Sequence, residues 1–257
     1  MVKGLNIFRD YFRNYAEHYI LIGGTACDLA MSEAGVNFRA TKDLDIVLCV
    51  EALDESFVKA FWAFIKAGDY QIQQKSTERK QFYRFQKPGN KDYPAMLELF
   101  SRKPDALTLA NESHLTPIPV DEDVSSLSAI LLNDDYYRFI QTGKTIIDTL
   151  SVVNPDRLIP LKVRAWIDLT ERKQRGEAID SKDIKKHRND VFRLYQIMQP
   201  DLIKDIPETI MADLSRFITL MTYEPIDLKL LGFGDTNLAT VLADLQRVYG
   251  LDANTNH

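Results

Sequence analysis

Hydrophobic and polar positions alternate between helical and strand spacings through the N-terminal part of the chain. Residues 5–18 carry apolar side chains on one helical face, and the apolar run at residues 19–22 predicts a short strand. A β-branched run at residues 43–48 predicts a second strand, and residues 54–67 predict an amphipathic helix. With a further helix predicted at residues 26–34, helices and strands alternate, which indicates a core of mixed α/β type.

The pattern changes to a period of two between residues 70 and 102, where we predict three strands, with a turn at residues 88–90 before the last of them. Several turn formers in residues 104–124 indicate an irregular linker. Helical spacing returns after it, and predicted helices occupy residues 124–143, 157–176, 181–198, 207–221 and 237–249.

These elements predict an α+β fold in two parts. Residues 1–120 should form a mixed sheet with flanking helices. Residues 121–257 should form a mainly helical C-terminal half.

Composition narrows the class of protein only moderately. The 257 residues are 45% hydrophobic and 27% charged, which is ordinary for a globular chain. No apolar run is long enough to cross a bilayer and the N-terminus is too polar for a signal peptide, so we expect a cytoplasmic protein with no membrane partner. A net charge of −5 argues against a surface built for duplex nucleic acid, but leaves room for a local basic groove.

The two cysteines indicate core packing rather than chemistry. Cys27 lies in a predicted helix and Cys49 in a predicted strand, each among apolar neighbours. Two cysteines in such contexts suggest neither a disulfide framework nor a zinc site.

A glycine pair follows the first strand and precedes a helix. Gly23 and Gly24 allow a tight turn and the close approach of a ligand, and Thr25 is a residue type that caps helices. Backbone N–H groups and the positive end of the helix dipole at this point suit a triphosphate. Alone, such a pair is more often an ordinary tight turn.

Two carboxylates stand at the head of the second strand. Asp43 and Asp45 are separated by one residue, so in a strand their side chains point the same way. This oxygen-rich arrangement suits Mg²⁺ or Mn²⁺, which binds carboxylates together with substrate phosphates. The order of glycine turn, helix and paired carboxylates therefore predicts metal-assisted phosphoryl or nucleotidyl transfer.

A third acid lies within an apolar strand. Glu98 is surrounded by apolar neighbours in the run MLELF, and a buried carboxylate there is costly without a cation or another partner. We interpret Glu98 as the third metal ligand; the alternative is a strand residue that faces solvent. The nearby cations Arg79, Lys80 and Arg84 could face phosphate, although their spacing is more typical of a solvated face.

The segment RATKDLDIVL, together with the preceding GGT, resembles the first motif of polymerase β-type nucleotidyltransferases. Within that superfamily it is similar to the AbiEii-like branch, because Arg39, Thr41, Asp43 and Asp45 match its Arg-x-Thr-x-Asp-x-Asp segment. Eighteen residues separate Gly24 from Asp43, a longer gap than in compact polymerase β relatives, which also favours this branch. The resemblance supports Glu98 as a third acid on a neighbouring strand.

The resemblance extends less specifically through residue 194. Lys162 matches a Lys-x-x-Ala segment, which implies a triphosphate contact, and Asp190 matches a second active-site acid in a helix with a lysine-rich start. The alternative for Lys162 is a lysine whose stem packs in the core while its ammonium reaches water. In this interpretation the helical half completes the active site, and Arg39 helps to neutralise the triphosphate.

These observations predict a Mg²⁺- or Mn²⁺-dependent enzyme that transfers a nucleoside monophosphate from a nucleoside triphosphate to an acceptor hydroxyl. AbiEii-like relatives are toxins of toxin–antitoxin pairs and some modify tRNA, so the resemblance implies tRNA as acceptor and a cognate antitoxin as partner. Residues 157–193 contain eleven Lys or Arg against six Asp or Glu, which suits a phosphate backbone. Two alternatives stay open: transfer to a small molecule such as an aminoglycoside, and a catalytically silent nucleotide-binding or interaction module.

Overall fold

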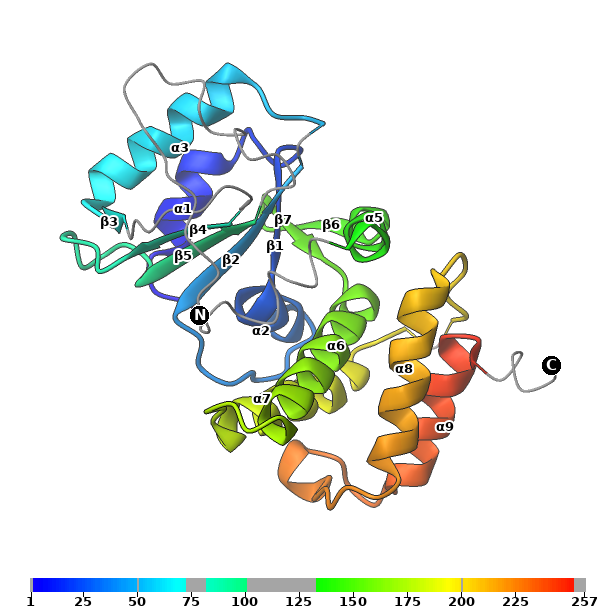
Figure 1. Cartoon of the computed structure of the whole chain (residues 1–257). Helices are drawn as coiled ribbons and strands as arrows, with labels where there is room; N and C mark the ends of the chain where they lie inside the picture. The colour runs from blue at the N-terminus through cyan, green and yellow to red at the C-terminus, as the bar shows by residue number, and fades with distance from the viewer. Residues whose placement is uncertain (1, 50, 73–81, 101–132, 200, 252–257) are drawn as a thin grey trace. The chain divides into compact units, whose positions relative to one another are not determined.

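The computed structural model describes residues 2–49, 51–72, 82–100, 133–199 and 201–251, and Figure 1 shows the chain. The chain divides into two compact units. The first unit contains residues 1–124 and 144–153, and the second contains residues 125–143 and 154–257. Within the described ranges, no helix combines the length and apolar character needed to cross a membrane. The predicted linker at residues 104–124 lies outside these ranges.

The first unit is built on a seven-stranded mixed sheet, as far as its described residues show, so the predicted mixed α+β architecture is confirmed. The strand order is β3-β4-β5-β2-β1-β7-β6. β2 pairs with β5 and β1 pairs with β7 in parallel, and the remaining neighbours are antiparallel. The strands are β1 (Tyr19–Ile22), β2 (Asp43–Leu48), β3 (Gln71–Ile72), β4 (Phe82–Gln86), β5 (Met96–Phe100), β6 (Lys144–Ile147) and β7 (Leu150–Val153).

The β6–β7 hairpin was not predicted from the sequence. It follows the helix α5 (Asp134–Thr142) and pairs with β1, which lies far away in the chain. Each of its strands has only four residues, and β7 is buried throughout, so neither shows the alternation that identifies a half-buried strand. The hairpin extends the sheet on the side of β1 away from β2.

Two helices cover one face of the sheet with aromatic side chains. α1 (Leu5–Phe12) and α3 (Glu55–Gly68) lie together on one side of the sheet in Figure 1. Phe12 is fully buried and its ring lies 5.5 to 6.2 Å from the rings of Phe64, Phe57, Tyr19 and Phe61. The predicted first helix is too long, because α1 ends at Phe12 and the chain then makes hydrogen-bonded turns before β1.

Strand register determines which residues lie on the other face. Tyr19, which contacts α1, is the antiparallel partner of Leu48, so Leu44, Ile46 and Leu48 face the aromatic helices. These three side chains are at most 1% exposed. Because side chains alternate along a strand, Asp43 and Asp45 must lie on the opposite face. There α2 (Gly23–Glu33) packs against β1 and β2.

The second unit is helical in its described residues. It contains α5, α6 (Pro155–Gln174), α7 (Ser181–Tyr195), α8 (Glu208–Met221), the short helix η1 (Lys229–Leu231) and α9 (Leu238–Val248). α6 and α7 pack against each other, and the ring of Trp166 meets that of Phe217 edge-on at 5.3 Å. Pro160 is tolerated in the second turn of α6, close to the start of the helix. The helices predicted from residue 157 onward are present.

The aromatic cluster should dominate the stability of the first unit. We expect Phe12→Ala to lower the free energy of unfolding by about 3–5 kcal/mol, because it leaves a cavity that the surrounding aromatic rings can fill only in part. Urea unfolding followed by circular dichroism measures this change. Tyr223→Ala is the control: Tyr223 is 85% exposed, so its loss should change stability by less than about 0.5 kcal/mol. Equal effects of the two substitutions would contradict this account of the core.

Candidate functional site

The glycine pair begins a helix directly at the end of β1. α2 starts at Gly23, with the extended Ile22 as its N-cap, so the prediction that Thr25 caps this helix is wrong. Thr25 lies instead in the first turn and is fully buried. Its hydroxyl donates a hydrogen bond of 2.7 Å to the backbone carbonyl of Asp43, which ties the start of α2 to the start of β2.

Glycine is required at position 23 for two separate reasons. Its φ of 66° lies in the left-handed region, which residues with a side chain rarely adopt. A Cβ atom there would also lie 1.7 Å from Oδ2 of Asp45. The backbone N–H of Gly24 donates a long hydrogen bond of 3.4 Å to the same oxygen. The turn therefore lets the acidic end of β2 approach the first residues of α2.

The segment before β2 also lies against the start of α2. A Cβ atom on Gly24 would be 2.5 Å from Oγ1 of Thr41 and 3.7 Å from Nη2 of Arg39. The Arg39 guanidinium lies 5.0 Å from the ring centroid of Phe38. The structure thus brings together six of the predicted site residues: Gly23, Gly24, Thr25, Arg39, Asp43 and Asp45.

Asp45, Glu98 and Arg84 form a row across three neighbouring strands. Asp45 is the parallel partner of Glu98, and Glu98 is the antiparallel partner of Arg84, so all three side chains share the face that carries Asp43. The sequence pattern placed Asp45 and Glu98 on separate strands, and the parallel pairing of β2 with β5 makes them neighbours. We call this set, Asp43, Asp45, Glu98 and Arg84, the acidic row.

Glu98 is held by Arg84. Its Oε1 accepts two hydrogen bonds from the guanidinium, 3.0 Å from Nε and 2.8 Å from Nη2. The side chains of Arg84 and Glu98 are 20% and 7% exposed. The interpretation of Arg84 as part of a solvated face is therefore wrong, because this cation compensates a buried carboxylate. Arg79 and Lys80, which were grouped with it, lie outside the described residues.

The donors on this face fit a divalent cation only in part. Asp43 and Asp45 supply the one or two carboxylates that Mg²⁺ usually takes from protein, leaving positions for water and phosphate. Among the residues that the structure describes, no group of three or more His, Cys, Asp or Glu is arranged to hold a metal ion. The carboxylate of Glu98 already forms an ion pair with Arg84 on this face.

Lys162 and Asp190 meet inside the helical unit. Their side chains are 3% and 0% exposed, and Lys162 Nζ lies 3.4 Å from Asp190 Oδ2. Arg193 Nη1 lies 3.3 Å from the other carboxylate oxygen, so both oxygens of Asp190 face cations. The predicted roles of Lys162 as a triphosphate contact and of Asp190 as an active-site acid stay predictions. The structure adds that each is the buried partner of the other.

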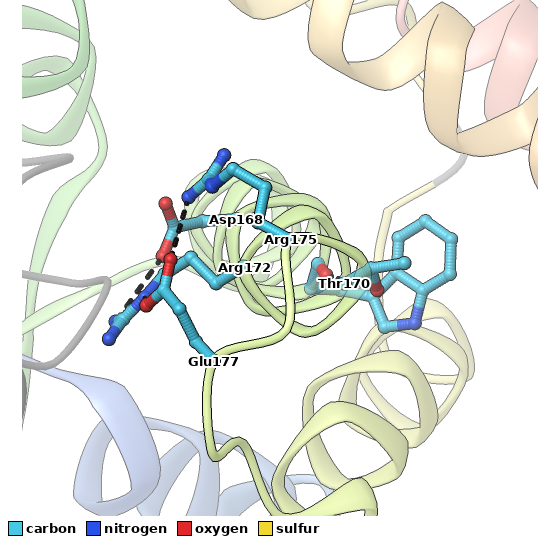
Figure 2. A network of polar contacts seen from close by, with 6 residues as sticks. Asp168, Thr170, Arg172, Arg175 and Glu177 are labelled. Carbon is cyan, nitrogen blue, oxygen red and sulfur yellow. Dashed lines mark hydrogen bonds and ion pairs between the residues drawn. The ribbon is translucent and has the colours of Figure 1, made fainter.

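Much of the positive charge counted in residues 157–193 is compensated within the helical unit. Figure 2 shows a network at the end of α6, in which Arg172 Nε lies 2.6 Å and Arg175 Nη2 3.1 Å from the Glu177 carboxylate. The hydrogen bond from Arg172 lowers the pKa of Glu177. Burial raises the pKa of Asp168, whose Oδ2 lies 4.0 Å from Arg172 Nη1.

Three lysines at the start of α7 differ from the arginines of this network in their ion pairing. Lys182, Lys185 and Lys186 are exposed, and none of them forms an ion pair within the described ranges. Sequence spacing indicated this surface only as part of a longer basic stretch. The structure separates these exposed lysines from the arginines that are paired with neighbouring acids.

No family model and no curated protein matches the chain. Among solved structures, it is similar to an antigenic nucleotidyltransferase-like protein from Paracoccidioides brasiliensis, with 13% identity, 93% of this chain and 89% of that chain covered, and a TM-score of 0.47. The antibiotic-resistance factor ANT(2'')-Ia is 12% identical to the chain, with 85% of this chain and 94% of that chain covered and a TM-score of 0.38. The Megavirus polyadenylate synthase is 13% identical, with 86% of this chain and 36% of that chain covered and a TM-score of 0.40. None of these likenesses assigns the chain to a family.

The contact between Gly23 and Asp45 predicts a sensitive position. We expect Gly23→Ala to destabilise the protein by about 1–2 kcal/mol through its positive φ alone, with a further loss from the clash with Asp45. Thermal and urea unfolding measure the change. Gly234→Ala is the matched control, since a Cβ atom there meets nothing within 4 Å, and its effect should stay within about 0.5 kcal/mol. A stable Gly23→Ala variant would show that α2 can begin differently.

The buried pair in the helical unit predicts an asymmetric response to mutation. Asp190→Ala removes a carboxylate that lies 3.4 Å from the buried Lys162 ammonium, and we expect a loss of about 3–5 kcal/mol in the free energy of unfolding. The double variant Lys162→Met, Asp190→Leu removes both charges and should recover most of that loss. Urea unfolding of the two variants gives the comparison. A double variant no more stable than Asp190→Ala would argue against this pairing.

Proposed function

We propose that the chain is a metal-dependent nucleotidyltransferase, which transfers a nucleoside monophosphate from a nucleoside triphosphate to an acceptor hydroxyl. The observation that carries the proposal is the contact between the glycine start of α2 and the acidic end of β2. Gly24 N lies 3.4 Å from Asp45, and only a glycine at position 23 leaves room for that carboxylate. The helix start that would bind phosphate and the two acids of β2 are thus parts of one local structure.

The start of α2 supplies the features that bind a triphosphate. α2 has eleven residues, and its first N–H groups have no partner within the helix, so the positive end of its dipole favours an anion. Arg39 adds a guanidinium next to Gly24. In this proposal Gly23, Gly24 and Thr25 contribute backbone N–H groups, and Arg39 contributes a positive charge, to the β- and γ-phosphates.

Asp43 and Asp45 would hold a Mg²⁺ or Mn²⁺ ion, because they lie on the same face at the end of β2. A divalent ion at this position supplies positive charge that offsets the negative charge of the triphosphate. The aspartate carboxylates would repel the phosphate oxygens if no cation lay between them. In this proposal the metal ion therefore joins the triphosphate to the two aspartates.

The proposed reaction is a displacement at the α-phosphorus. The acceptor hydroxyl oxygen forms a bond to the α-phosphorus, the bond from this phosphorus to the bridging oxygen of the β-phosphate breaks, and pyrophosphate leaves. The hydroxyl proton is released. The reaction needs no reactant other than the nucleoside triphosphate and the acceptor. What the protein contributes is orientation of the triphosphate by α2 and compensation of the charge on the leaving pyrophosphate.

We further propose a polyanionic acceptor, of which tRNA is the leading case. The supporting observation is the exposed group Lys182, Lys185 and Lys186 on α7, which has no ion pairs in the described part of the chain and can follow a phosphate backbone. The resemblance to AbiEii-like toxins, seen in the sequence, adds a cognate antitoxin to the proposal and keeps Lys162 as a candidate triphosphate contact. A small hydroxylated molecule is the alternative acceptor.

Transfer of α-labelled ATP, GTP, CTP and UTP tests the proposal. We expect label from one or more of them to move to bulk tRNA in the presence of Mg²⁺, and Asp45→Asn to lower the rate by at least about a hundredfold, because it removes a carboxylate that compensates the phosphates. Glu33→Gln is the matched control, since it neutralises an exposed acid in α2 and should leave the rate unchanged.

The outcomes separate the candidate functions. Label on RNA with the wild type alone supports the enzyme and identifies the base. Label on a small hydroxylated molecule but not on RNA supports the alternative acceptor. An absence of transfer to RNA, to protein and to small molecules, with nucleotide binding still present, would replace the enzyme by a silent nucleotide-binding module.

A further inference from the structure

We infer that the ring of Phe38 is a stacking surface for the nucleobase of the bound nucleoside triphosphate. Phe38 belongs to the arm of residues 36–42, which joins the turn after α2 to β2 (Figure 1). The inference rests on the proposed function, because it places the base of the same ligand whose phosphates are assigned to the start of α2. It adds a binding residue outside the glycine turn and the acidic row, with a role that the sequence did not suggest.

Phe38 differs from the other phenylalanines in its burial. It is half-buried, whereas every other phenylalanine whose exposure the structure describes is buried. Among the described residues, the Arg39 guanidinium lies over its ring, 5.0 Å from the centroid, and no other aromatic ring packs against it. A large apolar ring that is left partly in water is stabilised when a flat ligand covers it.

Arg39 places the ring close to the start of α2. Its Nη2 atom lies 3.7 Å from the position of a Cβ atom on Gly24, and its Nη1 atom donates a hydrogen bond of 3.5 Å to the carbonyl of Ala40. The same guanidinium lies over the ring of Phe38. One side chain is thus near both the helix start that would bind phosphate and the ring that would stack the base.

The arm that carries Phe38 is held near each of its ends. The backbone N–H of Val36 donates a hydrogen bond of 2.8 Å to the carbonyl of Met31 in α2. Thr41 Oγ1 lies 2.5 Å from the position of a Cβ atom on Gly24. Phe38 lies between these two points, so its ring is largely positioned before a nucleotide arrives, which reduces the entropy that binding costs.

A ring beside a guanidinium suits the two chemically different parts of a nucleotide. The guanidinium attracts phosphate oxygens, and the aromatic ring stacks on the flat face of a base. Every base has such a face, so Phe38 would favour nucleotides over inorganic polyphosphate without selecting one base. Selection among bases therefore depends on hydrogen-bonding groups other than this ring.

Two ligands, one with a base and one without, test the inference. Calorimetry with the full chain and Mg²⁺ measures the binding of inorganic tripolyphosphate and of nucleoside triphosphate analogues with a methylene group between the α- and β-phosphorus atoms. Phe38→Ala should weaken the analogue of each of the four bases at least about fivefold, the lower end of the loss expected for a stacking ring. Binding of tripolyphosphate should change by less than about twofold, because this ligand has no base to stack.

Further variants separate stacking from the packing of the arm. Phe38→Leu keeps an apolar side chain but has no aromatic face, so it should also weaken the analogues, at least about threefold, and spare tripolyphosphate. Phe38→Tyr keeps the ring and should bind the analogues within about twofold of the wild type. Val36→Ala is the matched control in the same arm: Val36 is 39% exposed, and its substitution should leave the binding of both ligands unchanged.

Equal weakening of both ligands in Phe38→Ala and Phe38→Leu would overturn the inference, since Phe38 would then act only by holding Arg39 and the arm in place. Unchanged binding of the analogues in both variants would overturn it as well. Failure of the proposed function looks different, because the wild-type chain would then bind neither the analogues nor tripolyphosphate. The two ideas can therefore fail separately.

Discussion

The close approach of Gly23 to Asp45 is the constraint on which the candidate site depends. β1 and β2 are antiparallel neighbours, and Ile22 is the register partner of Asp45, so the chain that leaves β1 passes directly beside this carboxylate. Any side chain at position 23 would occupy the space of Asp45 Oδ2. The same approach orients the first turn of α2, where Thr25 donates to the carbonyl of Asp43. The start of α2 and the start of β2 are therefore held together by contacts between side chains and backbone, which leave little room for substitution.

Compensation of buried charge is the second organising constraint, and both units follow it. Glu98 in the sheet is held by Arg84, and Asp190 in the helical unit lies between Lys162 and Arg193. A buried carboxylate without a partner is strongly unfavourable, so each of these acids has a counter-charge whatever its chemical role. Burial of an acid in an apolar strand consequently indicates a partner, and the partner need not be a metal. Glu98 is the example in the sheet, because its counter-charge is the guanidinium of Arg84.

Local patterns predicted those elements that show a clear apolar run or a helical spacing of apolar residues. β1 and β2 were predicted from their apolar and β-branched runs, and the helices after residue 157 from helical spacing. The separation of Asp43 and Asp45 by one residue predicted that they share a strand face. The predictions failed where a residue's role depends on contacts with distant parts of the chain, which local spacing does not indicate. Thr25 was assigned to a cap and is a tie to β2, and α1 stops at Phe12 because the chain turns before entering β1.

The sequence by itself determined the mixed α+β architecture, the order of glycine turn and acidic strand, and the types of residue available for phosphate and metal. Those features depend on residues close in the chain, whose periodicity and backbone preferences are local. Only the tertiary structure decided that β2 pairs with β5, that Arg84 neutralises Glu98, and that Lys162 meets Asp190. Pairs of this kind join residues far apart in the chain, and the choice of partner is made by strand order and helix packing, which no local spacing encodes.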